Sequence, residues 1–285
     1  MAKLLTTFPN LAEFEKACGS LASAGVRHEI VSPLPAYGRV GVPAVVLEEE
    51  ELASLATAHV DSFVCSGWVG FRRVTLTVPD SEPSGFAADI FGRCAIMVLA
   101  PCVADEVRIR LVAHISGDLG PVMPYLNATM AGGLYCPDGP TFTFMEGPRM
   151  ISLYSHRITL AKADEIVDAW RVLERVRVLA CEVWQRRETI SPCYTTRHRP
   201  PALEVYKRLP GTNCRACGEK TCMAFALRLW KAEVSPAQCE PVFAGRFGHL
   251  KPALLTICEG LGIDTKGLDD ATAGLPAFRQ QQTAG

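Results

Sequence analysis

Apolar and polar positions in the first eighty residues predict a small mixed α/β unit. Residues 3–8 form a short β-branched run, and Asn10 can cap a helix whose apolar positions recur at helical spacing. These positions are Leu11, Phe14, Ala17, Leu21 and Ala22. Further strands are expected at residues 26–31, 44–47 and 68–78, with a second helix at residues 48–60. The order resembles a βαββαβ unit and suggests a small α+β sandwich.

Turn and breaker residues at 79–85 interrupt this pattern and predict a boundary. After it we expect a buried strand at residues 94–100, and a helix at residues 104–115 with Val107, Leu111 and His114 on one side. A second helix is expected at 122–130, and strands at 141–145, 150–154 and 157–160 should form a meander. A long amphipathic helix, from Asp164 to about Arg187, should lie across that meander.

Four cysteines near the C-terminus, Cys214, Cys217, Cys222 and Cys239, form the array C-x2-C-x4-C-x16-C. A cubane cluster needs thiolates directed at one small volume, and Gly218 allows the tight turn that a short Cys-x2-Cys loop requires. Cys222 should begin an apolar helix, whose free N–H groups stabilise thiolate charge. Pro241, two residues beyond Cys239, suits a helix stop. The spacing therefore favours one [4Fe-4S] cluster per chain.

Zinc binding and simple burial are the two alternatives to a cluster. A structural zinc site also uses Cys-x2-Cys pairs, but it normally presents two such pairs, whereas the second half here is Cys222-x16-Cys239. The four cysteines could also be ordinary buried thiols, although four within 26 residues is far from chance clustering for 12 cysteines in 285 residues.

The segment at residues 203–243 resembles the four-cysteine Fe-S domain of the corrinoid iron-sulfur protein large subunit and of RnfB-type electron-transport subunits. The matching run is Leu-Pro-x-Thr-Asn-Cys-x-x-Cys-Gly-x-x-x-Cys-Met-Ala-Phe-Ala, which begins at Leu209. The resemblance implies that Cys214, Cys217, Cys222 and Cys239 are the cluster ligands, and it points to anaerobic metabolism. Residues 125–199 resemble the region before this domain in uncharacterised bacterial iron-sulfur proteins. The N-terminus resembles small sulfur or selenium carrier domains but lacks their cysteine, and Gly38-Arg39-Val40-Gly41 stands in its place.

The expected fold class is therefore α+β, with two small α+β units followed by a compact, mostly helical cluster domain. We expect domains at residues 1–80, 86–190 and 200–260, and a partly disordered tail at 261–285.

Composition narrows the cellular setting and the partners. A formal net charge of −1 gives no global attraction to nucleic acid. No run is long enough for a membrane span, and no secretory segment opens the chain, so we expect a cytoplasmic protein with free thiols. Most of the other eight cysteines should be small buried residues. Cys136 is the exception, because Gly and Pro nearby suggest an exposed, reactive turn.

A local excess of basic residues lies just before the cluster segment. It comprises Arg186, Arg187, Arg197, Arg199, Lys207 and Arg208. These residues could form a solvated linker or a docking patch for an acidic electron carrier.

The preferred function is one-electron transfer or redox support of a partner enzyme, through a ferredoxin-like or flavodoxin-like carrier or the enzyme itself. No P-loop, dinucleotide loop or Ser/His/Asp signature supports catalysis by this chain, so a non-catalytic accessory protein is expected. The alternatives are a component of a corrinoid, methyl-transfer or sulfur-handling system, and a non-redox scaffold stabilised by the cluster. The first is disfavoured because the chain has no Asp-x-His-x-x-Gly cobalamin motif and too few residues for the accompanying barrel.

Overall fold

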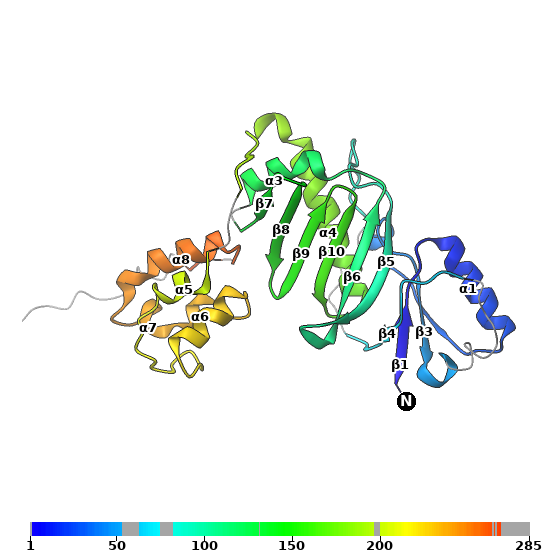
Figure 1. The fold of residues 1–285 in the computed structure, drawn as a ribbon, viewed down its shortest axis with the longest axis horizontal. Coiled ribbons are helices and arrows are strands. Elements are labelled where there is room, and N and C mark those ends of the chain that lie inside the picture. The colour runs from blue at the N-terminus through cyan, green and yellow to red at the C-terminus, as the bar shows by residue number, and fades with distance from the viewer. Residues whose placement is uncertain are drawn as a thin grey trace, which may run out of the picture. The chain divides into compact units, whose positions relative to one another are not determined.

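Antiparallel sheets and helices share the chain (Figure 1), which confirms the α+β fold class. The computed structural model describes residues 2–52, 63–74, 82–130, 132–196, 200–263, 265 and 267–268. The chain divides into two units, Met1–His198 and Arg199–Gly285.

The first unit begins with a four-stranded antiparallel sheet of order β2-β3-β1-β4. Its strands are β1 (Lys3–Thr6), β2 (Glu29–Val31), β3 (Ala44–Glu48) and β4 (Val69–Gly70), and a 3-10 turn, η1 (Pro35–Tyr37), precedes β3. Helix α1 (Leu11–Ser23) is capped as predicted, because the side-chain oxygen of Asn10 accepts the N–H of Glu13 at 2.9 Å. The expected strand at 68–78 is shorter, ending at Gly70, and its residues 75–78 lie outside the described residues, as do residues 53–60 of the second helix.

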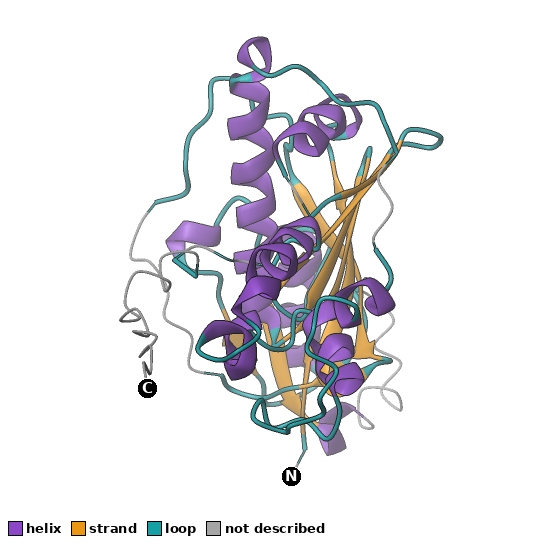
Figure 2. Ribbon diagram, turned by 90° about the vertical axis from the view of Figure 1, so that its left-hand side faces the viewer, coloured by secondary structure: helices purple, strands orange, loops and turns teal. Residues whose placement is uncertain are grey.

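A six-stranded antiparallel sheet of order β5-β6-β10-β9-β8-β7 forms the rest of this unit. Its last three strands in sequence form the predicted meander, and the long helix α4 (Ile166–Gln185) passes behind the sheet in Figure 1 and stands to one side of it in Figure 2. The strands are β5 (Cys94–Cys102), β6 (Asp105–Ile115), β7 (Leu134–Cys136), β8 (Thr141–Glu146), β9 (Arg149–Tyr154) and β10 (Arg157–Ala163). The other helices are η2 (Gly120–Val122), α3 (Met123–Thr129) and η3 (Arg187–Thr189).

The helix predicted at 104–115 is wrong, because these residues form the strand β6. The buried positions in it are Ile109, Leu111, Ala113 and Ile115, which alternate with more exposed neighbours. This period of two belongs to a strand with one covered face. Pairing with β5 on one side and β10 on the other satisfies the backbone groups of the strand.

Strand β10 contains a bulge next to its C-terminal end. Its register with β6 shifts between Ala161 and Ala163, and Lys162 between them has a φ of 65°. Ala163 is fully buried, and the carboxylate of Asp164 then accepts hydrogen bonds from Arg108 at 2.9 Å and from Arg149 at 2.7 Å.

Both sheets contribute to one hydrophobic core. Leu5, Val46 and Val69 of the first sheet belong to the same buried cluster as Leu111 and Leu153 of the second. A smaller cluster packs α1 against the first sheet, through residues such as Leu21 and Val45. Within the part of the chain that the structure describes, no helix is long and apolar enough to cross a membrane.

The second unit is built of short helices, as expected for the cluster domain. They are α5 (Ala202–Tyr206), α6 (Cys222–Trp230), η4 (Pro236–Gln238), α7 (Glu240–Phe243), η5 (Gly248–Leu250) and α8 (Lys251–Gly260). Its core joins Val205, Phe225, Leu229 and Leu254 with two of the predicted ligands, Cys222 and Cys239, so potential ligands are part of the packing. The expected tail beyond residue 268 lies outside the described residues.

Candidate metal centre

The loop that carries the first two cysteines coils tightly. Gly211, Asn213, Arg215 and Gly218 all have positive φ, at 68°, 50°, 63° and 84°. Glycine adopts this conformation without strain and asparagine tolerates it, whereas for arginine it is uncommon. The repeated left-handed residues bend the chain around Cys214, and Gly218 provides the turn that the sequence predicted.

Cys222 is the first residue of α6, as predicted, and the start of this helix is fastened twice. The hydroxyl of Thr221 accepts the N–H of Ala224 at 3.0 Å, and the side-chain oxygen of Asn213 accepts the N–H of Cys222 at 2.8 Å. The second bond ties the cysteine loop to the helix. Sequence analysis missed this role of Asn213, although an asparagine directly before a cysteine in a glycine-bearing loop was a usable signal.

Cys239 directly follows the 3-10 turn η4 and precedes α7. Pro241 lies in the first turn of α7, so the prediction that it stops a helix is wrong. Proline is well tolerated there because the first N–H groups of a helix have no partner inside the helix. Gly245 packs against this turn, and a Cβ at Gly245 would lie 2.9 Å from the Cα and from the carbonyl oxygen of Pro241.

The four cysteines predicted as ligands line one small cavity, together with Phe225 and other residues of the second unit. Their exposure differs: Cys222 and Cys239 are 8% and 5% exposed, Cys217 is half-buried and Cys214 is exposed. The cavity therefore has two thiols on its inner wall and one at its outer edge.

Burial raises the pKa of Cys239 to about 11. A hydrogen bond from the backbone of Val242 opposes this rise, while the neighbouring Cys217, Cys222 and Cys214 add to it. In the described residues, no group of three or more His, Cys, Asp or Glu side chains is arranged to hold a single metal ion. This observation concerns one-ion sites, whereas the four irons of a cubane are each held by a different thiolate.

Of the other eight cysteines only Cys102, Cys181 and Cys258 are buried and five are half-buried, so the prediction that most are buried is wrong. Burial raises the pKa of Cys94 and Cys258 to about 12. Cys258 is fully buried in the same core as Cys222 but does not line the cavity. Cys136 is half-buried at the end of β7 rather than on an exposed turn, and its thiol donates to the carbonyl of Asp138 at 3.4 Å, so that prediction is corrected.

Most of the basic residues before the cluster segment already have partners. Lys207 and Arg208 form ion pairs with Glu204 at 2.6 and 3.0 Å. In the first unit, the guanidinium of Arg187 stacks on Trp184 and pairs with Glu188, and Arg186 donates to the carbonyl of Glu182. Arg197 and Arg199 lie outside the described residues.

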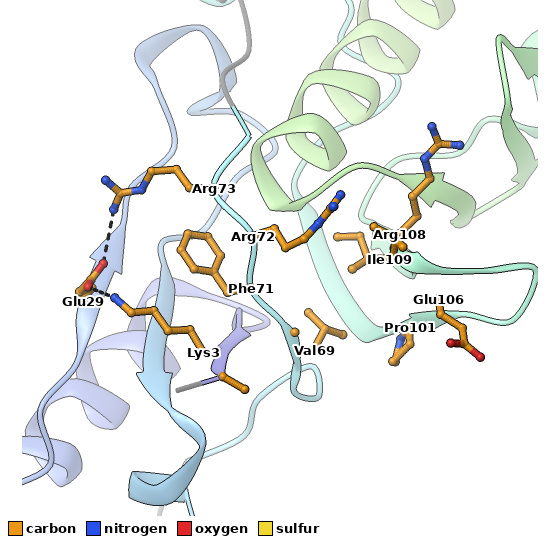
Figure 3. Close-up of a pocket in the computed structure, with 13 residues that line it drawn as sticks. Lys3, Glu29, Val69, Phe71, Arg72, Arg73, Pro101, Glu106, Arg108 and Ile109 are labelled. Atoms are coloured by element: carbon orange, nitrogen blue, oxygen red, sulfur yellow. Dashed lines mark hydrogen bonds and ion pairs between the residues drawn. The ribbon is translucent and has the colours of Figure 1, made fainter.

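A separate hollow of about 860 Å³ opens in the first unit between the ends of the two sheets (Figure 3). Lys3 and Arg73 both pair with Glu29, and Arg108 pairs with Asp164, so most of its cations are neutralised within the fold. No cysteine or histidine is among its lining residues.

Comparison with known proteins locates the match in the second unit. Residues 209–241 match the family described as "Putative Fe-S cluster", which confirms the resemblance of this segment to an iron–sulfur domain family. Similar proteins include the acetyl-CoA decarbonylase/synthase complex subunit gamma of Methanopyrus kandleri, 53% identical over 75 residues, and gamma 2 of Methanosarcina thermophila, 44% identical over 69 residues. These matches cover 24% and 21% of this chain but only 16% and 15% of the relatives. No solved structure matches the chain.

Proposed function

We propose that the second unit holds one [4Fe-4S] cluster through Cys214, Cys217, Cys222 and Cys239, and that the protein passes single electrons to or from a partner. The observation that carries the proposal is that these four cysteines line one cavity within a segment that matches an iron–sulfur family. When bound, the cluster supplies reversible one-electron chemistry.

The residues around the cavity suit such a group. Cys222 and Cys239 lie within the apolar core, which keeps water from the inner side of the site. The start of α6 directs partial positive charge toward Cys222, which favours thiolate and cluster charge. Asn213 and Gly218 hold the loop in a compact shape, so the cavity is formed by the fold of the chain itself.

Zinc is the competing occupant of four thiolates. The cysteine spacing supports the cluster over zinc, because only one Cys-x2-Cys pair is present. The family match, described as an Fe-S cluster, supports it further.

The partner is proposed to be an enzyme or its ferredoxin-like or flavodoxin-like carrier. Support comes from the relatives, which are named as subunits of an acetyl-CoA decarbonylase/synthase complex. Since the match covers about a sixth of their length or less, an accessory role in a comparable corrinoid or methyl-transfer system is the second candidate. The free cysteines of the chain support a reducing compartment such as the cytoplasm.

Anaerobic purification followed by iron and acid-labile sulfide analysis tests the proposal, with electron paramagnetic resonance before and after dithionite. We expect iron and sulfide in about a four-to-four ratio per chain and a signal that appears on reduction. Cys222→Ala should lose both, whereas Cys258→Ala, which removes a buried thiol from the same core, should keep them. Zinc without sulfide would overturn the proposal, and an intact cluster that cannot be reduced would favour the scaffold.

A further inference from the structure

Cys214 marks the outer edge of the proposed cluster site. It is the exposed member of the four cysteines, and it also lines a surface hollow of about 320 Å³. The opposite wall of this hollow comes from the segment after α7, including Arg246 and Phe247. A partner that reaches the hollow therefore contacts the exposed thiol without any opening of the core.

Basic residues follow this thiol along the cysteine loop and share its hollow. Arg215 and Lys220 belong to the cysteine loop, and the guanidinium of Arg246 lies 4.9 Å from the ring centroid of Phe247. All three are exposed, and within the described part of the chain none of them forms an ion pair.

The acidic residues nearby offset this charge only in part. Glu219 forms an ion pair with Arg228, which leaves Glu240 as the acidic residue of the hollow. The cations predicted from sequence as a docking patch in this unit, Lys207 and Arg208, are instead held by Glu204. The free basic side chains of this unit thus include Arg215 and Lys220 of the cysteine loop and Arg246 of the hollow.

We propose that this Cys214 face, defined by Cys214, Arg215, Lys220, Arg246 and Phe247, is the docking surface for an acidic iron–sulfur carrier protein of the ferredoxin type. The inference rests on the proposed function and adds the class of the partner protein and the path by which the electron enters. One electron leaves the reduced carrier and enters the oxidised cluster beside Cys214, so the carrier is oxidised by one electron and no atom is transferred.

Complementary charge on two proteins mainly raises the rate at which they associate. Complementary potentials raise association rates by about 10- to 1000-fold, and the gain falls steeply with ionic strength. One cation on the hollow, Arg246, and two more on the neighbouring cysteine loop fit a transient contact, in which the carrier must leave again after each transfer. Phe247 supplies an apolar centre for that contact.

Charge reversal on and off the face tests the proposal. Lys220→Glu combined with Arg246→Glu alters the face and spares the ligands. Lys231→Glu, next to the C-terminal end of α6, is the control for a charge reversal off the face, because α6 places it about 13 Å along the helix axis from Cys222. It changes the net charge half as much as the double variant does. The partner is a plant-type ferredoxin with an acidic surface. Two quantities are measured at low and high salt: its affinity in the oxidised form by calorimetry, and the second-order rate of electron transfer in stopped flow.

We expect the double variant to lower both the affinity and the transfer rate about tenfold at low salt, with the difference vanishing at high salt. Lys231→Glu should change either quantity by less than about twofold. The extent of reduction by dithionite should be the same in all three proteins. If Lys231→Glu, with half the charge change, slowed transfer by about threefold or more, net charge rather than this face would be responsible, and the proposal would be wrong.

Two results separate the inference from the proposed function. Full reduction by dithionite, with no difference in ferredoxin binding or transfer between wild type and the double variant, overturns the docking face and leaves the one-electron function standing. A cluster that dithionite cannot reduce overturns the one-electron function, and the inference with it, even if ferredoxin binding still depends on Lys220 and Arg246.

Discussion

The side-chain oxygen of Asn213 accepts the backbone N–H of Cys222 at 2.8 Å, and this bond links the loop of the first two thiols to the helix that begins with the third. Asn213 also adopts a φ of 50°, which asparagine tolerates better than most residues. One side chain therefore helps to set the spacing between the two parts of the candidate site.

Asn213 variants should rank by how much of this arrangement they keep. Asn213→Ala loses the bond and strains the left-handed backbone, each costing about 1 kcal/mol, so we expect cluster loss to a chelator to be at least about tenfold faster. Asn213→Gly keeps the backbone freedom and should be intermediate. Asn213→Asp keeps both features and should resemble wild type. Iron release measured over time checks the order, and equal lifetimes for Ala and Asp would contradict this role.

Gly245→Ala should loosen the segment that follows Cys239. The new Cβ would lie 2.9 Å from backbone atoms of Pro241, so α7 must shift, at an expected cost of about 1–3 kcal/mol. Gly248→Ala is the control, because the nearest atom to its Cβ is 3.8 Å away. Urea unfolding of the anaerobic protein, followed by far-ultraviolet circular dichroism, checks the difference. Equal midpoints for the two variants would show that α7 adapts without cost.

Removing the cluster should destabilise the second unit alone. Cys222 and Cys239 are part of its core, so emptying the site leaves two unligated thiols inside a small set of short helices. We expect the helical signal of this unit to lose its cooperative melting after chelation, while the sheet signal of the first unit melts as before. Calorimetry with and without chelator measures this. An unchanged second transition would mean that the helices hold without the cluster.

Acid should weaken the first unit partly through Asp89. Burial alone would raise the pKa of this carboxyl, but hydrogen bonds from the amides of Gly92 and Phe91, together with Arg177, lower it overall. A lowered pKa in the folded state gives stability that is present above the ordinary carboxyl pKa, about 4, and is lost as the pH falls below it.

Asp89→Asn should remove this pH-dependent part. At pH 7 the variant should be less stable by about 1 kcal/mol, a modest value because the Asp89 side chain is 25% exposed and water screens the pair. Below about pH 4 the two proteins should converge. Urea unfolding at both pH values, followed by the fluorescence of the buried Trp170, gives the difference. A constant gap at every pH would exclude a contribution from ionisation.

Local chemistry made several elements predictable. Asn10 caps α1, the meander forms at the expected strands, and α4 spans nearly the expected range, because each depends on residues close in sequence. The strand β6 was missed because Val107, Leu111 and His114 also fit a helical spacing, and only pairing with β5 and β10 decides between the two.

In the candidate site, too, the features set by residues close in sequence were predictable and those set by packing were not. The cysteine spacing predicted four thiols around one volume, since three of them share a short loop. Which of the four thiols is exposed depends on how α6 and α7 pack, and the cysteine spacing does not determine that packing. The pairing of Lys207 and Arg208 with Glu204 had a signal, because they follow Glu204 by three and four positions at the end of a short helix. That Arg215, Lys220 and Arg246 form no ion pair among the described residues is known only from the fold.

The bulge at Lys162 decides where strand β10 can lose a residue without losing its register. Strict alternation after Ile158 and Leu160 would send Lys162 into the core, and the extra residue gives that place to Ala163 instead. Deleting Lys162 would keep Ala163 on the covered face, because the strand would then alternate regularly, whereas deleting Thr159 would turn Leu160 away from the core. A one-residue deletion can therefore be absorbed at the bulge but not in the regular part of the strand.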